Sequence, residues 1–405
     1  MSRIAEEMNS LNRIIFITNL NVLGGTENNL VSVVTHPVFN STFISSVFSG
    51  TPPHPAIAAR LAEFNVRIVQ HNRLAKIRMP RTFRGHLFDR QLNKVDPDVV
   101  VFWNHVARPG QLTVCRRSSI RTVFFERGTG WKEHDPERMN NFLSSMDLVL
   151  SNSRAGAKIL QLKWGYEGDC VVLPNALRPE IADRHVSDRV SPRLDSPMRI
   201  GVAARLVAYK GVASVVLAAK RLAESGLNAE LHIAGNGPEG RMLQELCKKN
   251  ALPANFLGAV QDMAGFYDGI DLLVCPSIRE PFGTVVLEAQ ARGCPVVCAG
   301  VDGLPEIVLH GKTGFIVEPR WELEEYLEYV SSREDMPEVV YCPGRGSLDS
   351  PLASHPGDVA AAVRQTVSDP DGYLNMSRAA REFVLKNFRF DSHLKSFRDI
   401  LLQAQ

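Results

Sequence analysis

The feature that most constrains the fold is a strand, a loop, a helix and a second strand that follow one another between residues 272 and 299. The apolar run Leu272-Leu273-Val274-Cys275 predicts a buried strand, and Val285 to Arg292 predicts a helix ended by Gly293. Cys294 to Ala299 predicts the next strand. Strands joined through a helix run parallel, so the intervening loop lies at the carboxyl end of the sheet, where open parallel sheets bind ligands.

This loop carries groups that suit a ligand with both phosphate and hydroxyl groups. The amides of Gly283 and Thr284 fall at the predicted helix N-terminus, where unpaired N–H groups and the positive end of the dipole favour an anion or a polarised sugar oxygen. Glu280 lies on the loop and Glu288 on the helix, so two carboxylates flank the predicted anion site.

The same stretch resembles a known family. The Glu-x7-Glu spacing of Glu280 and Glu288, with Pro276-Ser277 before it and Phe282-Gly283 within it, is similar to the motif of retaining glycosyltransferase family four. The resemblance covers most of the C-terminal half of the chain and extends more weakly into the N-terminal half. It implies the GT-B architecture and transfer of a sugar from a nucleotide diphosphate sugar.

Length and charge narrow the class of protein. The 405 residues suffice for two domains of usual size, and 46 basic against 44 acidic residues give no excess of positive charge that would indicate nucleic acid. No apolar stretch approaches the ~20 residues of a membrane-spanning helix. Met1 to Leu11 is polar and acidic, which does not fit a signal peptide. We therefore expect a soluble cytoplasmic protein without a nucleic-acid partner.

The cysteines do not follow a metal-binding pattern. All seven are scattered between Cys115 and Cys342, without a Cys-x2-Cys pair, and Cys294 and Cys298 fall on a predicted buried strand. The sequence also has no Asp-x-Asp metal motif. We expect reduced thiols, no structural metal, no cofactor and metal-independent chemistry.

In the N-terminal half, a glycine pair follows the first predicted strand. Arg13 to Asn19 is that strand, and Gly24-Gly25 precedes a helix from about Asn28 to Val34. Such a pair lets backbone amides approach a ligand closely, although in most proteins it is a plain turn. The resemblance implies that Gly24 and Gly25 belong to a loop that closes over the donor diphosphate and the acceptor.

Two further predicted strands end in polar residues. His105 follows the strand from Pro97 to Trp103, and Glu126 follows the strand from Arg121 to Phe125. Carboxyl ends of parallel strands meet at one edge, so both side chains should face the ligand, although a lone histidine is more often structural. Many family members carry a histidine at the second position, and this chain has Glu126 there instead.

Arg67 to Arg90 is a cationic segment with interleaved apolar residues. It predicts either peripheral contact with an anionic membrane or binding of an anionic acceptor, and the alternative is a helix with a solvated basic face.

The C-terminal half carries a second set of motifs at strand ends. Arg205 and Lys210 flank the loop after the strand that begins at Arg199, where a guanidinium and an ammonium could converge on a diphosphate. Gly235-Asn236 follows the strand from Ala229, and Val260 follows Gly258, where the nucleotide base passes in relatives.

These alternations predict an α/β fold of two doubly wound, Rossmann-like domains that face a central cleft. The predicted boundaries are an acceptor domain at 1–180, a linker at 181–197, a donor domain at 198–380, and a C-terminal helix at 381–405 that crosses back to the first domain. Arg320 to Gly357 departs from the family pattern, and we assign it no role.

The predicted function is retaining glycosyl transfer to a hydroxyl of a glycan, a lipid-linked or a small-molecule acceptor, in polysaccharide or glycoconjugate biosynthesis. An epimerase or hydrolase of the same architecture and an inactive sugar-nucleotide-binding subunit are the alternatives. The resemblance implies catalytic roles for Arg205, Lys210 and Glu280, donor contacts by Gly25, Gly235, Asn236, Val260, Pro281, Phe282, Gly283, Thr284, Val285 and Glu288, and weaker contacts by Gly24, His105 and Glu126.

Overall fold

The computed structural model describes residues 12–403 except 23, 75–76, 187–188 and 193–195. The chain divides into a first unit, Met1–Pro174 with Asp391–Gln405, and a second unit, Asn175–Phe390. The predicted linker at 181–197 thus falls within the second unit. Met1 to Leu11, the stretch that does not fit a signal peptide, and Lys76 of the cationic segment lie outside the described residues.

The first unit is built on a parallel sheet of seven strands in the order β3-β2-β1-β6-β7-β8-β9. Its interior strand β1, third in this order, is an apolar run whose residues Ile14 to Ile17 are fully buried, as expected for a sheet covered on both faces. The strands are β1 (Asn12–Thr18), β2 (Phe43–Ser49), β3 (Arg67–Gln70), β6 (Val99–Trp103), β7 (Arg121–Glu126), β8 (Leu148–Ser151) and β9 (Cys170–Val172).

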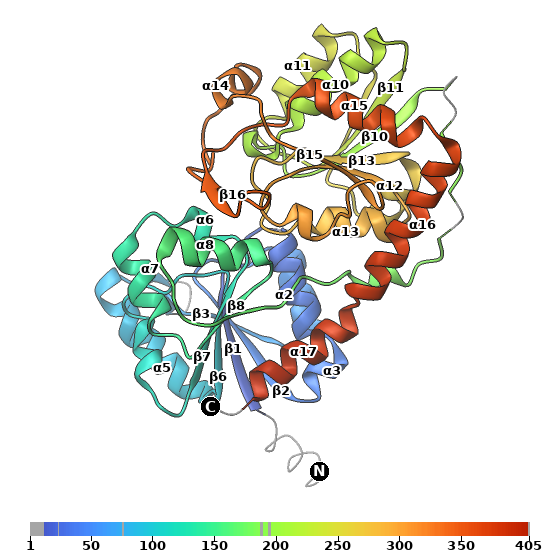
Figure 1. The fold of residues 1–405 in the computed structure, drawn as a ribbon. Coiled ribbons are helices and arrows are strands. Elements are labelled where there is room, and N and C mark those ends of the chain that lie inside the picture. The colour runs from blue at the N-terminus through green and yellow to red at the C-terminus, as the bar shows by residue number, and fades with distance from the viewer. Residues whose placement is uncertain (1–11, 23, 75–76, 187–188, 193–195, 404–405) are drawn as a thin grey trace. The chain divides into compact units, whose positions relative to one another are not determined.

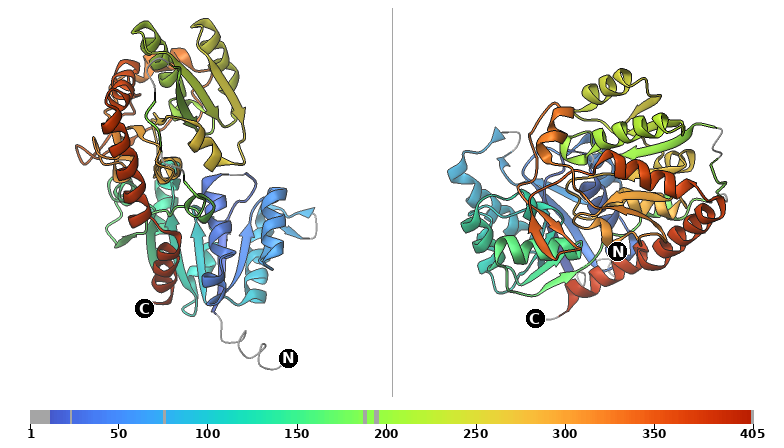
Figure 2. Two further views of the ribbon diagram at one scale, coloured as in Figure 1. Left: turned by 90° about the vertical axis from the view of Figure 1, so that its right-hand side faces the viewer. Right: turned by 45° about the horizontal axis from the view of Figure 1, so that its top comes forward.

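Helices lie on both faces of this sheet (Figures 1 and 2). Their ends follow the expected capping rules: α8 begins after Ser153, whose hydroxyl accepts from the Gly156 amide, and it ends at Gly165 with a φ of +63°. The helices are α2 (Gly25–Val34), α3 (Pro37–Asn40), α4 (Pro55–Glu63), α5 (Arg84–Val95), α6 (Thr129–Lys132), α7 (Pro136–Leu143), α8 (Arg154–Trp164) and α17 (Phe390–Leu402), with 3-10 turns at Arg81–Phe83 and Leu112–Arg116.

The cationic segment from Arg67 to Arg90 is not one helix. It contains β3, then a small antiparallel hairpin of β4 (Arg73–Leu74) and β5 (Ile77–Arg78), and the helix α5 starts only at Arg84. The alternative prediction, a helix with a solvated basic face, is therefore wrong for the first half of the segment.

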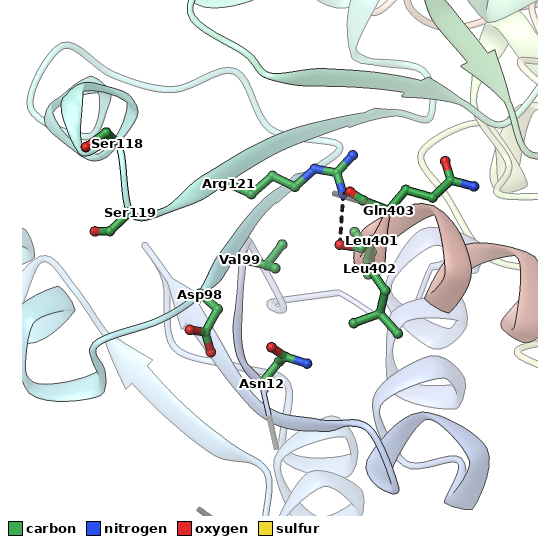
Figure 3. A pocket seen from close by; sticks show the side chains of 9 residues that line it. All are labelled: Asn12, Asp98, Val99, Ser118, Ser119, Arg121, Leu401, Leu402 and Gln403. Atoms are coloured by element: carbon green, nitrogen blue, oxygen red, sulfur yellow. Dashed lines mark hydrogen bonds between the residues drawn. The ribbon is translucent and has the colours of Figure 1, made fainter. Parts of the chain in front are cut away.

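The last helix, α17, packs into the first unit through Phe397. Its ring lies 5.9 Å from the Phe39 ring, 6.0 Å from Trp103 and 5.7 Å from Phe125. At the far end of α17, Arg121 Nη1 donates to the carbonyls of Ile400 and Leu401 at 3.0 and 2.9 Å, inside the pocket of Figure 3. A guanidinium at a helix C-terminus satisfies its unpaired carbonyls, so this pocket anchors the helix and lies at the amino ends of β6 and β7.

The second unit is a parallel sheet of six strands in the order β12-β11-β10-β13-β14-β15, again between helices. The strands are β10 (Met198–Ala203), β11 (Ala229–Ala234), β12 (Ala254–Gly258), β13 (Leu272–Cys275), β14 (Val296–Ala299) and β15 (Gly314–Val317). The helices are α9 (Pro179–Ala182), α10 (Val212–Glu224), α11 (Gly240–Lys249), α12 (Met263–Gly269), α13 (Thr284–Ala291), α14 (Leu323–Tyr326), α15 (Pro356–Val367) and α16 (Pro370–Asn387), with 3-10 turns at Ala208–Lys210, Leu304–Glu306 and Leu327–Tyr329.

The departure between Arg320 and Gly357 contains α14 and an antiparallel hairpin. Its strands are β16 (Val340–Cys342) and β17 (Ser347–Asp349), and the stretch from Pro343 to Gly346 is the turn between them. Among the described residues, no helix has both the length and the apolar composition needed to cross a membrane.

Candidate functional site

In the second unit, the loops after β10 and β13 are in direct backbone contact. Gly211 has a φ of +70°, and a Cβ there would lie 2.1 Å from the carbonyl oxygen of Pro276, so only glycine fits. The Ile278 amide donates to the Tyr209 carbonyl at 2.8 Å. These contacts bring Lys210, at the end of the first loop, next to Glu280 on the second.

Lys210 and Glu280 form the central ion pair of the site. The Nζ and Oε2 atoms are 2.6 Å apart, and the two side chains are only 16% and 14% exposed. Burial opposes the charge on Lys210, but the Glu280 carboxylate together with Tyr209 and Cys275 outweighs it, and the lysine pKa is raised. The Ser277 hydroxyl also donates to Glu280 Oε2, at 3.3 Å. A charged pair is therefore held at the carboxyl edge of the sheet.

Arg205 lies at the same edge and is not part of this pair. Its side chain is exposed, and it makes no hydrogen bond or ion pair with any residue that the structure describes. The loop that carries it is fixed by its neighbour, because a Cβ on Gly235 would lie 1.8 Å from the Ala204 carbonyl oxygen and the Leu206 amide donates to the Asn236 carbonyl. Arg205 is thus a guanidinium on a rigid loop, available to an anion.

The N-terminus of α13 completes this group. Gly283 takes a φ of +95° as the cap, and no side chain caps the helix. Within the described part of the chain, the amides of Gly283 and Thr284 donate no hydrogen bond, so they remain available to a ligand oxygen. Asn175 reaches the Thr284 hydroxyl through Nδ2 at 3.4 Å.

Glu288 does not lie open at this edge. It is 3% exposed, and its carboxylate accepts from Arg178 Nε at 2.7 Å and from the Tyr267 hydroxyl at 2.9 Å. Burial and the Glu288 charge hold the pKa of Tyr267 well above its usual value. The structure thus gives Glu288 two protein partners, and its contact with the donor stays a prediction that would require Arg178 or Tyr267 to share the carboxylate.

The remaining predicted donor contacts surround the same loops. Phe282 is buried with its ring 6.2 Å from Phe388, whereas Asn236 is exposed. Pro281, Val285 and Val260 are half-buried, and Val260 packs on the hydrophobic core below the loops.

Asp302 is a site residue that the sequence analysis missed. It is fully buried and has a φ of +47°, which is unusual for a residue other than glycine. One carboxylate oxygen accepts from the Glu280 amide at 2.9 Å and the other from the Tyr341 amide at 2.8 Å. Asp302 therefore ties the Glu280 loop to hairpin β16–β17. The only signal in the sequence was an acidic residue three positions after the end of strand β14 and directly before Gly303.

Arg279 was also missed. It is 4% exposed, its guanidinium lies 4.4 Å above the Tyr209 ring, and Lys210 Nζ lies 5.5 Å from the same ring. Two cations thus share one aromatic ring beside Glu280.

In the first unit, the glycine pair begins α2. Gly24 is the cap, without a side-chain capping bond, and Gly25 is the exposed first residue of the helix. Trp103 Nε1 donates to the Thr26 carbonyl at 3.2 Å, and the Arg127 guanidinium stacks 4.4 Å above the Trp103 ring. The glycine pair therefore lies beside the carboxyl end of β6, at the edge where we predicted it.

His105 and Glu126 differ in their access to this edge. His105 is partly exposed, and its Nε2 lies 3.1 Å from Gln111 Oε1. Glu126 is fully buried and accepts from the backbone amides of Gly128 and Gly130. Burial raises the pKa of Glu126 to about 7 despite these amides. The Glu126 side chain thus holds its own loop, and its contact with a ligand stays a prediction.

Comparison with known proteins finds a family match within the second unit. Residues 184–341 match the family described as glycosyl transferases group 1. An uncharacterized glycosyltransferase of Methanocaldococcus jannaschii is 39% identical over 120 residues, which are 29% of this chain and 30% of the relative. The capsular polysaccharide biosynthesis glycosyltransferase CapM of Staphylococcus aureus is 27% identical over 180 residues, 43% of this chain and 47% of the relative. The matches thus span less than half the length of these relatives.

Similarity to solved structures extends over nearly the whole chain. Anabaena HepE, solved with UDP and glucose, superposes with a TM-score of 0.71 at 16% identity, over 97% of this chain and 100% of that one. A glycosyltransferase from Rickettsia africae gives a TM-score of 0.74, also at 16% identity, over 98% and 100%. The predicted fold class, two Rossmann-like units of the GT-B type, is confirmed.

Proposed function

We propose that this chain, whose residues 184–341 belong to the group 1 glycosyl transferases, moves a sugar from a nucleotide diphosphate sugar to an acceptor hydroxyl with retention of anomeric configuration. The observation that carries the proposal is the convergence of Lys210, Glu280, Arg205 and the uncapped N-terminus of α13 at one edge of a parallel sheet. This edge offers positive charge and N–H donors for a diphosphate beside a carboxylate for sugar hydroxyls.

The roles follow from the positions of these groups. Arg205 and Lys210 stabilise the negative charge that grows on the leaving diphosphate, and the Gly283 and Thr284 amides bind a phosphate or sugar oxygen. Glu280 accepts from sugar hydroxyls once Lys210 turns to the phosphate. The bond from the anomeric carbon to the phosphate oxygen breaks, the acceptor oxygen bonds that carbon on the same face, and the acceptor proton passes to the departing phosphate.

The names of similar proteins support a donor and a pathway class. HepE has been solved with UDP-glucose and CapM is named for capsular polysaccharide biosynthesis, so a uridine nucleotide sugar and a glycan or glycoconjugate product are the first candidates. We also propose that no metal is needed, because two cations already face the diphosphate position. Activity that persists in excess chelator supports this point, and activity that returns only with added Mg²⁺ or Mn²⁺ contradicts it.

Thermal-shift measurements with UDP, GDP, ADP and their sugars test the proposal, since a ligand that binds the folded protein raises its Tm. We expect one nucleoside diphosphate family to stabilise the protein. With that donor and a panel of acceptors, proton NMR of the product should show the anomeric configuration of the donor. Inversion contradicts the retaining mechanism, and release of free sugar at a rate independent of acceptor indicates a hydrolase.

We further propose that the protein contacts membranes peripherally from the cytoplasmic side. Hairpin β4–β5 and the turn before α5 expose Ile77 at 72% and Phe83 at 57%, next to the basic side chains of Arg78 and Arg84. Exposed apolar side chains among cations are typical of segments that bind the interface of anionic bilayers.

A further inference from the structure

A cluster of polar side chains gathers at the strand carboxyl ends of the first unit. It comes from three places in the sequence: the end of β3, the start of α5, and the loop after β6 with the turn that follows. We call it the His71 cluster, and its members are His71, Asn72, Arg84, His105, Arg108 and Gln111.

The first part of the cluster meets at Gly50, which has no side chain. A Cβ on Gly50, directly after β2, would lie 3.5 Å from His71 Nε2 and 3.8 Å from Asn72 Nδ2. Asn72 Nδ2 donates to the Gly50 carbonyl, which fixes its amide. The imidazole and the amide therefore face the same small space above the end of β2.

The second part is fixed by Gln111. Its Oε1 lies 3.1 Å from His105 Nε2 and accepts from the Arg108 amide at 2.9 Å. The turn that carries Arg108 packs against the start of α5, where a Cβ on Gly110 would lie 3.0 Å from the Gly85 Cα. This close approach places the turn that carries Arg108 beside the start of α5, where Arg84 lies.

Two buried polar atoms of the cluster have no partner within the described residues. Gln111 is 4% exposed and its Nε2 makes no hydrogen bond, and Asn72 is 6% exposed and its Oδ1 makes none. A buried polar atom without a partner is costly, and a bound ligand is one way to satisfy it. The Gln111 N–H₂ beside imidazole and guanidinium groups offers donors to an anion, whereas Asn72 Oδ1 is an acceptor and does not support anion binding.

The electrostatic surroundings of the two histidines also favour an anion. Burial, followed by the charges of His105, Arg108 and Arg84, lowers the pKa of His71 to about 4, and burial also lowers that of His105. None of the groups that act most strongly on either histidine is a carboxylate. The positive charge of the cluster therefore comes from Arg84 and Arg108, beside two histidines that burial keeps uncharged near neutral pH.

We propose that the His71 cluster binds a phosphate group of the acceptor, with the Gln111 amide and Arg108 as donors to its oxygens and with the two imidazoles as donors once the phosphate favours their protonated forms. This inference rests on the proposed function only in calling the ligand an acceptor. Phosphate suits the arrangement because its several oxygens can accept from donors on separate loops, and the phosphate can belong to a soluble sugar or to a lipid headgroup.

Histidine NMR tests the site directly. We expect glucose 6-phosphate and inorganic phosphate, but not glucose, to shift the Cε1–H signals of His71 and His105 and to raise the pH at which they titrate. Assignment uses His71→Asn and His105→Asn. Arg108→Gln should weaken the apparent affinity for phosphate by roughly 10-fold, because it removes a charged donor. Arg90→Gln, an exposed position on α5 with the same change of charge, is the matched control.

Three outcomes separate the possibilities. If anionic vesicles of phosphatidic acid, but not soluble phosphates, bind in a way that needs Arg108, the phosphate belongs to a lipid. If neither source moves the two histidines, or if Arg108→Gln and Arg90→Gln have equal effects, the proposal is overturned. Binding of the nucleoside diphosphate, measured in the same variants by thermal shift, reports on the proposed function separately. The phosphate site can therefore fail its test while the proposed function stands, and the reverse.

Discussion

At the scale of single residues, the contact between Lys210 and Glu280 determines how the candidate site meets its donor. The two charges lie 2.6 Å apart and are largely buried, so each satisfies the other in the absence of a ligand. A diphosphate offers Lys210 a second anion, and Glu280 is then left to accept from the sugar. Binding of the donor should therefore rearrange this pair.

Arg205→Ala and Lys210→Ala should each reduce turnover by on the order of 100-fold, because each removes positive charge from the leaving diphosphate in the transition state. Steady-state kinetics checks this, with Arg241→Ala as a control at an exposed arginine of α11. The Tm of Arg205→Ala should equal that of the wild type, since its side chain has no partner within the described chain. Turnover near the wild-type value in both variants would exclude the proposed diphosphate site.

Glu280→Gln should impair the use of the sugar donor while preserving affinity for the free nucleoside diphosphate. The amide keeps one acceptor oxygen but no longer pairs with Lys210 as a charge. Calorimetric titration with the nucleoside diphosphate and with its sugar separates the two effects. A variant that loses affinity for the free nucleoside diphosphate would show that Glu280 acts elsewhere than on the sugar.

At the scale of elements, Asp302 connects hairpin β16–β17 to the loop of Glu280. Its two carboxylate oxygens accept one backbone amide from each. This gives the departure between Arg320 and Gly357 a physical link to the site, although the sequence offered no role for it.

Asp302→Ala should lower turnover by roughly 10-fold to 100-fold, because it frees the Glu280 backbone by breaking one of its fixed bonds. Asp302→Asn should recover part of the activity, since asparagine tolerates positive φ and keeps one acceptor. Asp335→Ala is the control, as Asp335 is exposed and also has a positive φ, of +65°. Equal effects at 302 and 335 would mean that backbone strain, and not the link to Glu280, is responsible.

The exposed hairpin β4–β5 leads to a prediction about membranes. The protein should sediment with anionic vesicles at low salt and be released at moderate salt, because each basic residue near the surface contributes roughly 1 kcal/mol. Ile77→Ser with Phe83→Ser should weaken sedimentation, whereas Leu162→Ser, an exposed leucine on α8, should not. Failure of the wild type to bind anionic vesicles at low salt rejects peripheral contact through this segment.

At the scale of the whole molecule, buried histidines should make the first unit sensitive to acid. Burial lowers the pKa of both His71 and His393 to about 4, below the usual 6.5. The unfolded chain then binds more protons than the folded protein between these values, so stability is present above pH 6.5 and is lost as the pH falls through about 4.

The Tm of His393→Phe should fall less than that of the wild type between pH 6.5 and pH 4.5. The substitution removes one buried histidine and preserves an aromatic ring near Phe397. Glu126, whose pKa is raised, changes the stability in the opposite direction as the pH falls. This change is the same in the wild type and in His393→Phe, so it cancels when the two are compared. His134→Phe, at an exposed histidine, should leave the slope unchanged. Parallel wild-type and His393→Phe curves would contradict the assignment.

The local sequence determined the helices, the strands and the loops that carry the candidate site residues. Apolar runs such as Leu272 to Cys275 predict buried strands because burial of such side chains drives folding, and polar residues and glycines mark where strands end. From these signals the α/β fold and the grouping of Arg205, Lys210 and Glu280 at strand ends could be predicted.

Only the tertiary structure decided which of those side chains face a ligand. Glu126 is buried on its own loop, and Glu288 is bound by Arg178, which lies 110 positions away in the sequence. Asp302 joins Glu280 to Tyr341, 22 and 39 positions away. Periodicity reports which face of an element is apolar, but the partner of a buried polar group is chosen by packing between distant segments. That choice exists only once the chain has folded.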